Sequence, residues 1–331
     1  MKIPRFLTCG LMMAGAVIAF GKSAPQISNT YPPPEDIRKP DITISGDASQ
    51  PIRVIAYNPN GRFLAVADYK TIRVYDARPG DRLTGELSQT LSGHADKVVA
   101  IGFSGTNTLV SVALDQTAKI WDMTSGKMMH SVPLEFGKEM VTAFAPGGQP
   151  LLAGAASNNL RLWNYQTGEM LTNFVTNDSG VSAMAFTPDG KSLVIGTWKG
   201  VVRVLDLAAW KVTRIIDLDS PIHSLATTTN RIVLGYGDGT VAMLKFEEQT
   251  SIPVVKKQSG AINAVAFSAD GKRFASASED GTVKVWETET MKWVCSLDAH
   301  DGAVLEVAFS PDGREVVSGD ADGKVDGWLL K

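Results

Sequence analysis

A strand-and-turn pattern recurs seven times along this chain, and it constrains the fold more than any other sequence feature. The segments 98–104, 181–187, 262–268 and 304–310 align with one another, and each alternates apolar and other side chains as a β-strand does. A turn follows in most copies, such as Pro-Asp-Gly at 188–190 and 311–313, whose Asp and Gly tolerate positive φ. A second strand, a second turn and a third strand complete each copy. The sequence therefore predicts a repeated antiparallel β-unit.

The third strand of each copy ends in a large apolar or aromatic residue. These residues are Tyr75, Trp121, Trp163, Leu205, Leu244, Trp286 and Trp328. Successive members are 39 to 46 residues apart, most often 42, which is the period of a four-stranded propeller blade. Because one blade cannot bury both of its faces, the copies must stack into one ring. We predict an all-β fold, a seven-bladed β-propeller of four-stranded antiparallel blades.

The ends of the repeat region predict how the ring closes. The last copy stops at Lys331, directly after its third strand, so it lacks an outer strand. Residues 41–46, which precede the first copy, alternate as a strand does. We expect this N-terminal strand to complete the last blade, because pairing it there removes an exposed edge. The propeller is then expected to span residues 41–331.

Several segments resemble WD repeats. The most specific are Asp-Gln-Thr-Ala-Lys-Ile-Trp-Asp at 115–122 and Asp-Gly-Thr-Val-Lys-Val-Trp-Glu at 280–287, with Gly-His at 93–94 and a near match at 299–300. The resemblance implies a buried network in which Asp and Ser satisfy the imidazole and the Ser accepts from the indole N–H. The network residues carried over are His94, Ser111, Asp115 and Trp121, then His300, Ser318, Asp322 and Trp328, and Ser276, Asp280 and Trp286 in the sixth copy, where Ser259-Gly260 replaces Gly-His.

Ser, His and Asp are also the residue types of a hydrolase triad. Two copies of the set and the absence of a Gly-x-Ser-x-Gly segment favour a structural role, and no catalytic residue is assigned. The turns at 124–127 and 167–169 resemble a turn of quinone-dependent dehydrogenase propellers, without a calcium site or a cofactor-sandwiching tryptophan. An enzyme of either type acting at the central channel remains the alternative. We expect no cofactor and no metal site.

The turns between second and third strands should lie on one rim of the ring. Exposed aromatic residues in such turns are typical of binding anchors. The residues of this candidate protein-binding rim are Tyr69, Lys70, Asn158, Asn159, Trp198, Lys199 and Tyr236. The WD-repeat resemblance then implies a non-enzymatic protein–protein interaction scaffold of unknown partner. A closed ring needs no second subunit for its strands, so we expect a monomer.

The N-terminus predicts export. Lys2 and Arg5 precede an uncharged apolar run at 6–20, which is shorter than the roughly 20 residues of a membrane span, and a small-x-small site ends at Gly21. We interpret residues 1–21 as a signal peptide, or alternatively as an uncleaved anchor, and the proline-rich segment 22–40 as a tether. A bacterial periplasmic protein is expected; with the anchor retained, it becomes a membrane-tethered accessory subunit of an envelope complex.

Charge and cysteine content exclude one class of partner and two kinds of cysteine site. Asp and Glu number 35 against 32 Lys and Arg, so nucleic acid is not an expected partner. The two cysteines, Cys9 and Cys295, cannot form a disulfide framework or a thiolate zinc site.

Overall fold

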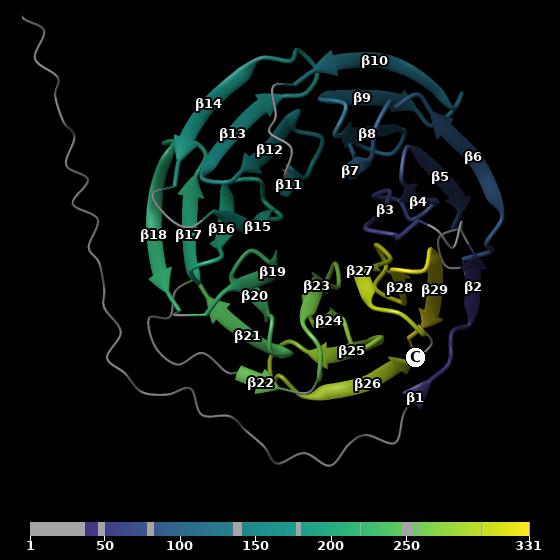
Figure 1. Ribbon diagram of the computed structural model, residues 1–331, viewed down its shortest axis with the longest axis vertical. Coiled ribbons are helices and arrows are strands. Elements are labelled where there is room, and N and C mark those ends of the chain that lie inside the picture. Colours follow the sequence, from purple (N-terminus) through teal and green to yellow (C-terminus); the bar gives the residue numbers. More distant parts are fainter. Residues whose placement is uncertain are drawn as a thin grey trace, which may run out of the picture.

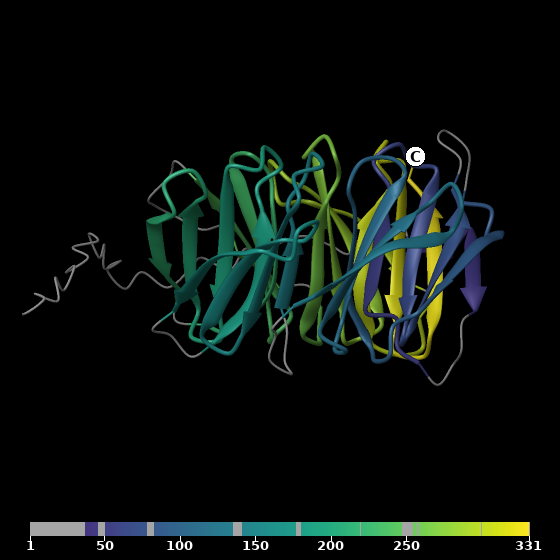
Figure 2. The same ribbon diagram turned by 90° about the horizontal axis from the view of Figure 1, so that it is seen from above.

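The computed structural model describes residues 37–45, 50–77, 83–134, 141–176, 180–218, 220–246, 254–256, 258–298 and 300–330. Within these ranges every regular element is a β-strand, and none is a helix that could cross a membrane. The strands form seven sheets arranged as blades around a centre (Figure 1), and the ring is a flat disc when seen from its side (Figure 2). The seven-bladed propeller predicted from the repeats is confirmed.

Blades 1 to 6 are each built on an antiparallel meander of four strands that run outward from the centre in chain order. Blade 1 consists of β3 (Val54–Tyr57), β4 (Phe63–Asp68), β5 (Thr71–Asp76) and β6 (Leu87–Ser92). Blade 2 consists of β7 (Val98–Phe103), β8 (Thr108–Ala113), β9 (Thr117–Asp122) and β10 (Lys127–Pro133). Blade 3 consists of β11 (Val141–Phe144), β12 (Leu151–Ala156), β13 (Asn159–Asn164) and β14 (Met170–Val175). Blade 4 consists of β15 (Val181–Phe186), β16 (Ser192–Thr197), β17 (Val201–Asp206) and β18 (Lys211–Asp217).

The remaining blades follow the same order. Blade 5 consists of β19 (Ile222–Thr227), β20 (Arg231–Tyr236), β21 (Thr240–Lys245) and β22 (Val254–Lys256). Blade 6 consists of β23 (Ile262–Phe267), β24 (Arg273–Ser278), β25 (Thr282–Glu287) and β26 (Trp293–Asp298). Blade 7 takes β27 (Val304–Phe309), β28 (Glu315–Asp320) and β29 (Lys324–Leu329) from the C-terminal end of the chain.

The fourth strand of blade 7 comes from the N-terminal part of the chain. Strand β2 (Ile42–Ser45) pairs antiparallel with β29, in the register Ile42 to Gly327 and Ser45 to Lys324 (Figure 1). The Thr43 hydroxyl donates a hydrogen bond to Asp326 Oδ1 at 2.5 Å, which adds a side-chain contact to the backbone ladder. The predicted closure of the ring by the segment at 41–46 is thus confirmed.

The chain joins the propeller earlier than the sequence predicted. Strand β1 (Ile37–Arg38) pairs parallel with β26, at the outer edge of blade 6. The Trp328 indole N–H donates to the Arg38 carbonyl oxygen at 3.2 Å, so this segment also contacts blade 7. A strand of two residues is too short to show alternation, so the sequence pattern does not distinguish it from the proline-rich tether. Residues 1–36, with the expected signal peptide and most of the tether, lie outside the described residues.

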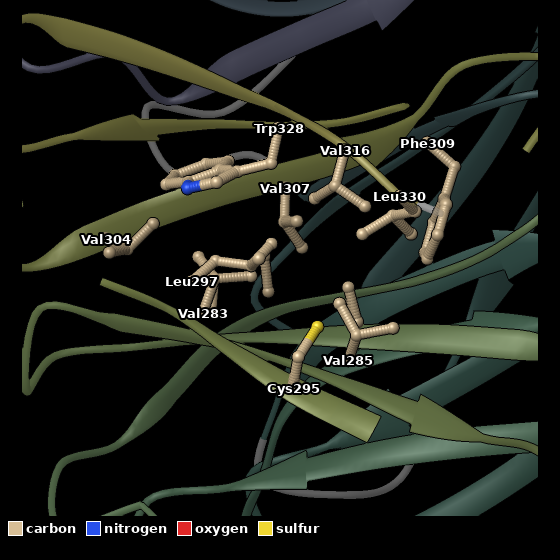
Figure 3. Packing of buried hydrophobic residues seen from close by; sticks show 13 residues of the cluster. Val283, Val285, Cys295, Leu297, Val304, Val307, Phe309, Val316, Trp328 and Leu330 are labelled. Carbon is tan, nitrogen blue, oxygen red and sulfur yellow. The ribbon is translucent and has the colours of Figure 1, made fainter. Parts of the chain in front are cut away.

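The core lies between the blades. Each of the seven hydrophobic clusters joins two adjacent blades around the ring. In Figure 3, Val285 and Cys295 of blade 6 face the side chains of blade 7. The large residues that end the third strands are all at most 6% exposed. Full burial of one such side chain is worth about 1.5–3 kcal/mol, so every interface stabilises the ring.

Candidate functional site

The topology divides the connections between two faces of the disc. Because neighbouring strands in a blade alternate in direction, the turn between the second and third strands lies on the same face as the connection from one blade to the next. We call this the upper face; it carries the turns at 69–70, 198–199, 237–239 and 322–323. The turns between the first and second strands, such as 188–190, lie on the opposite, lower face.

The predicted network is present in blade 2. His94 Nδ1 lies 2.9 Å from Asp115 Oδ2, and His94 Nε2 lies 2.7 Å from the Ser111 hydroxyl. The Trp121 indole N–H donates to the same hydroxyl at 2.8 Å. Burial lowers the pKa of His94 and outweighs the opposing effect of its hydrogen bond to the Asp115 carboxylate. A neutral imidazole can donate from Nδ1 to the carboxylate and accept from the serine, so all three polar side chains are satisfied.

The environment of Asp115 keeps its carboxylate charged. Burial raises the pKa of Asp115, but hydrogen bonds from Thr117, from the Ala95 N–H and from His94 outweigh it and lower the pKa. The Ser111 side chain is completely buried. A serine held between an indole and an imidazole without access to solvent cannot attack a substrate, so this Ser-His-Asp set holds the blade together.

In blade 7 the prediction of Asp322 as the network aspartate is wrong. His300 Nδ1 lies 2.7 Å from Asp320 Oδ2, and His300 Nε2 lies 2.6 Å from the Ser318 hydroxyl. Asp320 ends β28 and is 1% exposed, whereas Asp322 is exposed in the following turn. The Asp322 N–H donates to Asp320 Oδ1 at 3.0 Å, so Asp320 stabilises the turn and binds the imidazole at the same time. The Trp328 indole, expected to donate to Ser318, instead donates to the carbonyl of Arg38.

A second buried carboxylate beside His300 was not predicted. Asp326 Oδ2 lies 3.6 Å from His300 Nδ1 and 3.1 Å from Lys324 Nζ. Asp326 is fully buried on β29, at the position that holds Lys119 in blade 2 and Lys284 in blade 6. An acidic residue at a position that is basic in other copies is the signal that could have revealed it.

Blade 6 replaces the histidine with glutamine. The Trp286 indole N–H donates to the Ser276 hydroxyl at 2.9 Å, and this hydroxyl donates to Gln258 Oε1 at 2.6 Å. Asp280 Oδ2 instead accepts from the Ser259 N–H at 2.7 Å. The sequence assigned Ser276, Asp280 and Trp286 but missed Gln258, which directly precedes the Ser-Gly pair that stands in place of Gly-His.

Two aromatic residues of the candidate binding rim are exposed on the upper face. Trp198 is 48% exposed and its ring meets that of His223 edge-on, with centroids 5.2 Å apart. Tyr69 is 42% exposed, and Lys70 Nζ lies 5.4 Å from the centroid of its ring. Lys199 is exposed beside Trp198. These residues have the placement expected of binding anchors.

The other rim residues differ in exposure. Asn159 is exposed at the start of β13, whereas Asn158 is half-buried and its carbonyl accepts from the Thr176 N–H at 2.8 Å. Tyr236 was expected in an exposed turn, but it ends β20 and packs against the hydrophobic cluster between blades 4 and 5. Burial, and then the charge of Asp238, raise the pKa of Tyr236. Tyr236 therefore belongs to the core and is not an exposed anchor.

In the part of the chain that the structure describes, no group of three or more His, Cys, Asp or Glu residues could hold a metal ion. Cys295 is completely buried on β26.

Comparison with known proteins agrees with this geometry. The family model of the WD domain, G-beta repeat, matches residues 38–76, 85–122, 168–206, 250–287 and 291–328, more than half of the chain. The chain belongs to the WD-repeat family. The unmatched stretches include the inner three strands of blades 3 and 5, where Ser157 replaces the aspartate and Leu244 replaces the tryptophan.

Two known proteins are similar to part of this chain. One is an uncharacterized WD repeat-containing protein of Synechocystis sp., 33% identical over 30% of this chain and 28% of its own length. The other is the mRNA export factor GLE2 of Chaetomium thermophilum, 28% identical over 34% of this chain and 32% of its own length. The chain thus spans about a third or less of each relative's length.

Proposed function

We propose that this WD-repeat protein is a non-enzymatic scaffold that binds a protein partner through the upper face of its ring. The supporting observation is a pair of large aromatic side chains, Trp198 and Tyr69, held exposed on a rigid frame. Aromatic residues of this kind dominate binding energy at protein interfaces.

Backbone hydrogen bonds hold both aromatic turns in place. The Trp198 N–H donates to the Gly180 carbonyl at 3.1 Å, and the Gly200 N–H donates to the Thr197 carbonyl at 3.0 Å. The Tyr69 carbonyl accepts from the Val98 N–H of blade 2 at 2.6 Å. Because these turns are ordered before a partner arrives, binding costs less conformational entropy.

Export to the cell envelope is part of the proposal. It is supported by the charged start, the apolar run and the small-x-small site within residues 1–21. With this segment removed, the propeller is a soluble periplasmic scaffold; with the segment retained, the same propeller is a tethered subunit of an envelope complex. Intact-mass analysis of the native protein distinguishes the two, because cleavage after Gly21 gives a chain that starts at Lys22.

The test is affinity capture of the native protein from its own cell envelope, with the recovered partner quantified for wild type and variants. Trp198→Ala is expected to weaken partner binding about thirtyfold, the change that corresponds to a hot-spot loss of about 2 kcal/mol, and partner recovery should fall with it. Its free energy of unfolding should change by less than about 1 kcal/mol, because half of the side chain is already in solvent.

Trp210→Ala is the matched control. Trp210 is 44% exposed, similar to Trp198, but it lies in the turn between β17 and β18 on the lower face. Partner recovery should stay at the wild-type level in this variant. Recovery that falls with Trp210→Ala and persists with Trp198→Ala would overturn the assignment of the upper face.

A further inference from the structure

Exposed charged residues are unevenly distributed over the upper face. Exposed acidic residues lie on the turns and blade connections of blades 5, 6 and 7: Asp238, Glu279, Asp301 and Asp322. Basic residues lie on blades 1 and 2: Arg53 just before β3, Lys70 in the turn after β4, and Lys97 just before β7. The protein as a whole has a formal charge of −3, so the basic side is a local exception.

These three basic residues and Tyr69 lie on the adjoining upper turns of blades 1 and 2, and we call the four residues the basic cluster. Lys70 lies over the Tyr69 ring. The Tyr69 carbonyl accepts from the N–H of Val98, the residue that follows Lys97, so the turn of blade 1 touches the start of blade 2.

Arg53 lies close enough to Lys97 to affect its titration. Burial lowers the pKa of Lys97, and the positive charge of Arg53 lowers it further. The repeat geometry agrees, because Asn263, at the corresponding position of blade 6, donates to the Val304 carbonyl of the next blade at 2.9 Å. Arg53 holds this position in blade 1, and its charge reaches Lys97 of blade 2.

Each nearby carboxylate has a hydrogen-bond or ion-pair partner other than the charged groups of Arg53, Lys70 and Lys97. Asp96 Oδ1 accepts from the backbone N–H of Lys97 at 2.7 Å, Asp68 pairs with Arg73, and Asp115 binds His94. Among the residues that the structure describes, Arg53, Lys70 and Lys97 form no ion pair with a carboxylate. The positive charges of Arg53 and Lys97 therefore repel each other, and water screens this repulsion only partly.

We propose that the basic cluster binds an acidic segment of the protein partner, with carboxylates placed between Arg53 and Lys97 and apolar atoms against Tyr69. This inference rests on the proposed function of the upper face. A carboxylate placed there relieves the repulsion between the two cations and adds charge-assisted hydrogen bonds from the guanidinium.

The opposite half of the face restricts what the ligand can be. A nucleic acid strand or an anionic bilayer that extends across the ring would bring its phosphates against Glu279, Asp301 and Asp322. Like charges placed together across an interface oppose binding. A short acidic stretch of polypeptide, confined to blades 1 and 2, avoids these carboxylates.

The test measures binding of a fluorescein-labelled peptide of about eight glutamates to the full chain by anisotropy, with a serine peptide of the same length as the neutral probe. The glutamate peptide should bind, and its Kd should rise about tenfold between low and physiological salt, because exposed charges are screened over about 8 Å at physiological ionic strength. Arg53→Glu, Lys97→Glu and Lys70→Glu should each raise the Kd about fivefold or more.

Lys127→Glu is the matched control, since it makes the same charge change on the outer strand β10, away from the upper face. It should alter the Kd less than twofold. Lys70→Glu keeps the test valid if a variant at Lys97 folds poorly, because Lys70 is exposed in a turn. An equal loss of binding in the control variant would overturn the basic cluster as the site.

Two further outcomes separate this inference from the proposed function. If Trp198→Ala abolishes partner capture while the charge variants leave it unchanged, the acidic-segment inference is overturned and the scaffold function stands. If none of these variants changes capture, both are overturned. Tighter binding of single-stranded DNA or phosphatidylglycerol vesicles than of the glutamate peptide, lost in the same charge variants, would also overturn the acidic-segment inference.

Discussion

Glu306 gives the sharpest test of how the ring handles buried charge. It lies on β27, the innermost strand of blade 7, at the position occupied by Ala100, Ala183 and Ala264 in blades 2, 4 and 6. Burial raises the pKa of Glu306 to about 8. The Val307 N–H donates to Glu306 Oε1 at 3.2 Å, and this hydrogen bond opposes the rise in pKa. We predict that Glu306→Gln stabilises the protein at high pH.

The direction in which stability changes with pH follows from the number of protons that the folded and unfolded states bind. Above about pH 4.5 the carboxyl of the unfolded chain is ionised, whereas the folded protein keeps its proton up to about pH 8. The folded state therefore binds more protons in this window, and the stability contributed by Glu306 falls as pH rises from 5 to 8. Each pKa unit is worth about 1.36 kcal/mol, so the shift sets a ceiling of roughly 4–5 kcal/mol. Because the side chain is only partly buried, solvent screening reduces the expected loss to about 2–3 kcal/mol.

The assay is urea unfolding followed by tryptophan fluorescence at several pH values between 5 and 8. Glu306→Gln should exceed wild type by about 2–3 kcal/mol at pH 8 and by less than about 1 kcal/mol at pH 5. Taking the difference between variant and wild type removes other titrations, including that of His94, whose lowered pKa acts in the opposite direction. Glu169→Gln, at an exposed residue, is the control and should show no pH-dependent difference. A difference for Glu306→Gln that does not change with pH would refute the reasoning.

Two other substitutions test local features of the structure. Asp320→Ala should lose about 2–4 kcal/mol of stability in thermal or urea unfolding, because it removes the buried carboxylate that lies 2.7 Å from His300 Nδ1, whereas Asp322→Ala should lose less than about 0.5 kcal/mol. Equal losses would contradict the assignment of Asp320. Gly239→Ala should cost about 3 kcal/mol or more, since its φ is +82° and a Cβ would lie 2.0 Å from the Gln258 carbonyl oxygen. Gly105→Ala, with a φ of +79° and open space around it, should cost only about 1 kcal/mol, and a similar cost at both glycines would rule out the steric explanation.

Much of the fold follows from local sequence pattern. The alternation within strands, the turn residues and the spacing of the large closing residues are all short-range signals, and they predicted the number of blades. They also predicted that β2 closes blade 7, because an unpaired edge in the last copy leaves one place for an alternating segment. The blade 2 network was likewise predicted, since His94, Ser111, Asp115 and Trp121 keep the spacing of the family pattern.

Contacts between segments distant in the chain were decided only by the tertiary structure. The direction of the turn after β28 determines that Asp320, not Asp322, reaches His300. The exposed edge of β26 accepts β1, which is too short to have a pattern of its own. The uneven charge distribution on the upper face has the same origin, because Arg53 and Lys97 are brought together only when blades 1 and 2 pack side by side. The period of the sequence repeat specifies each blade. Which side chains of a blade are buried, and which residues they contact, depends on the side chains of the neighbouring blade.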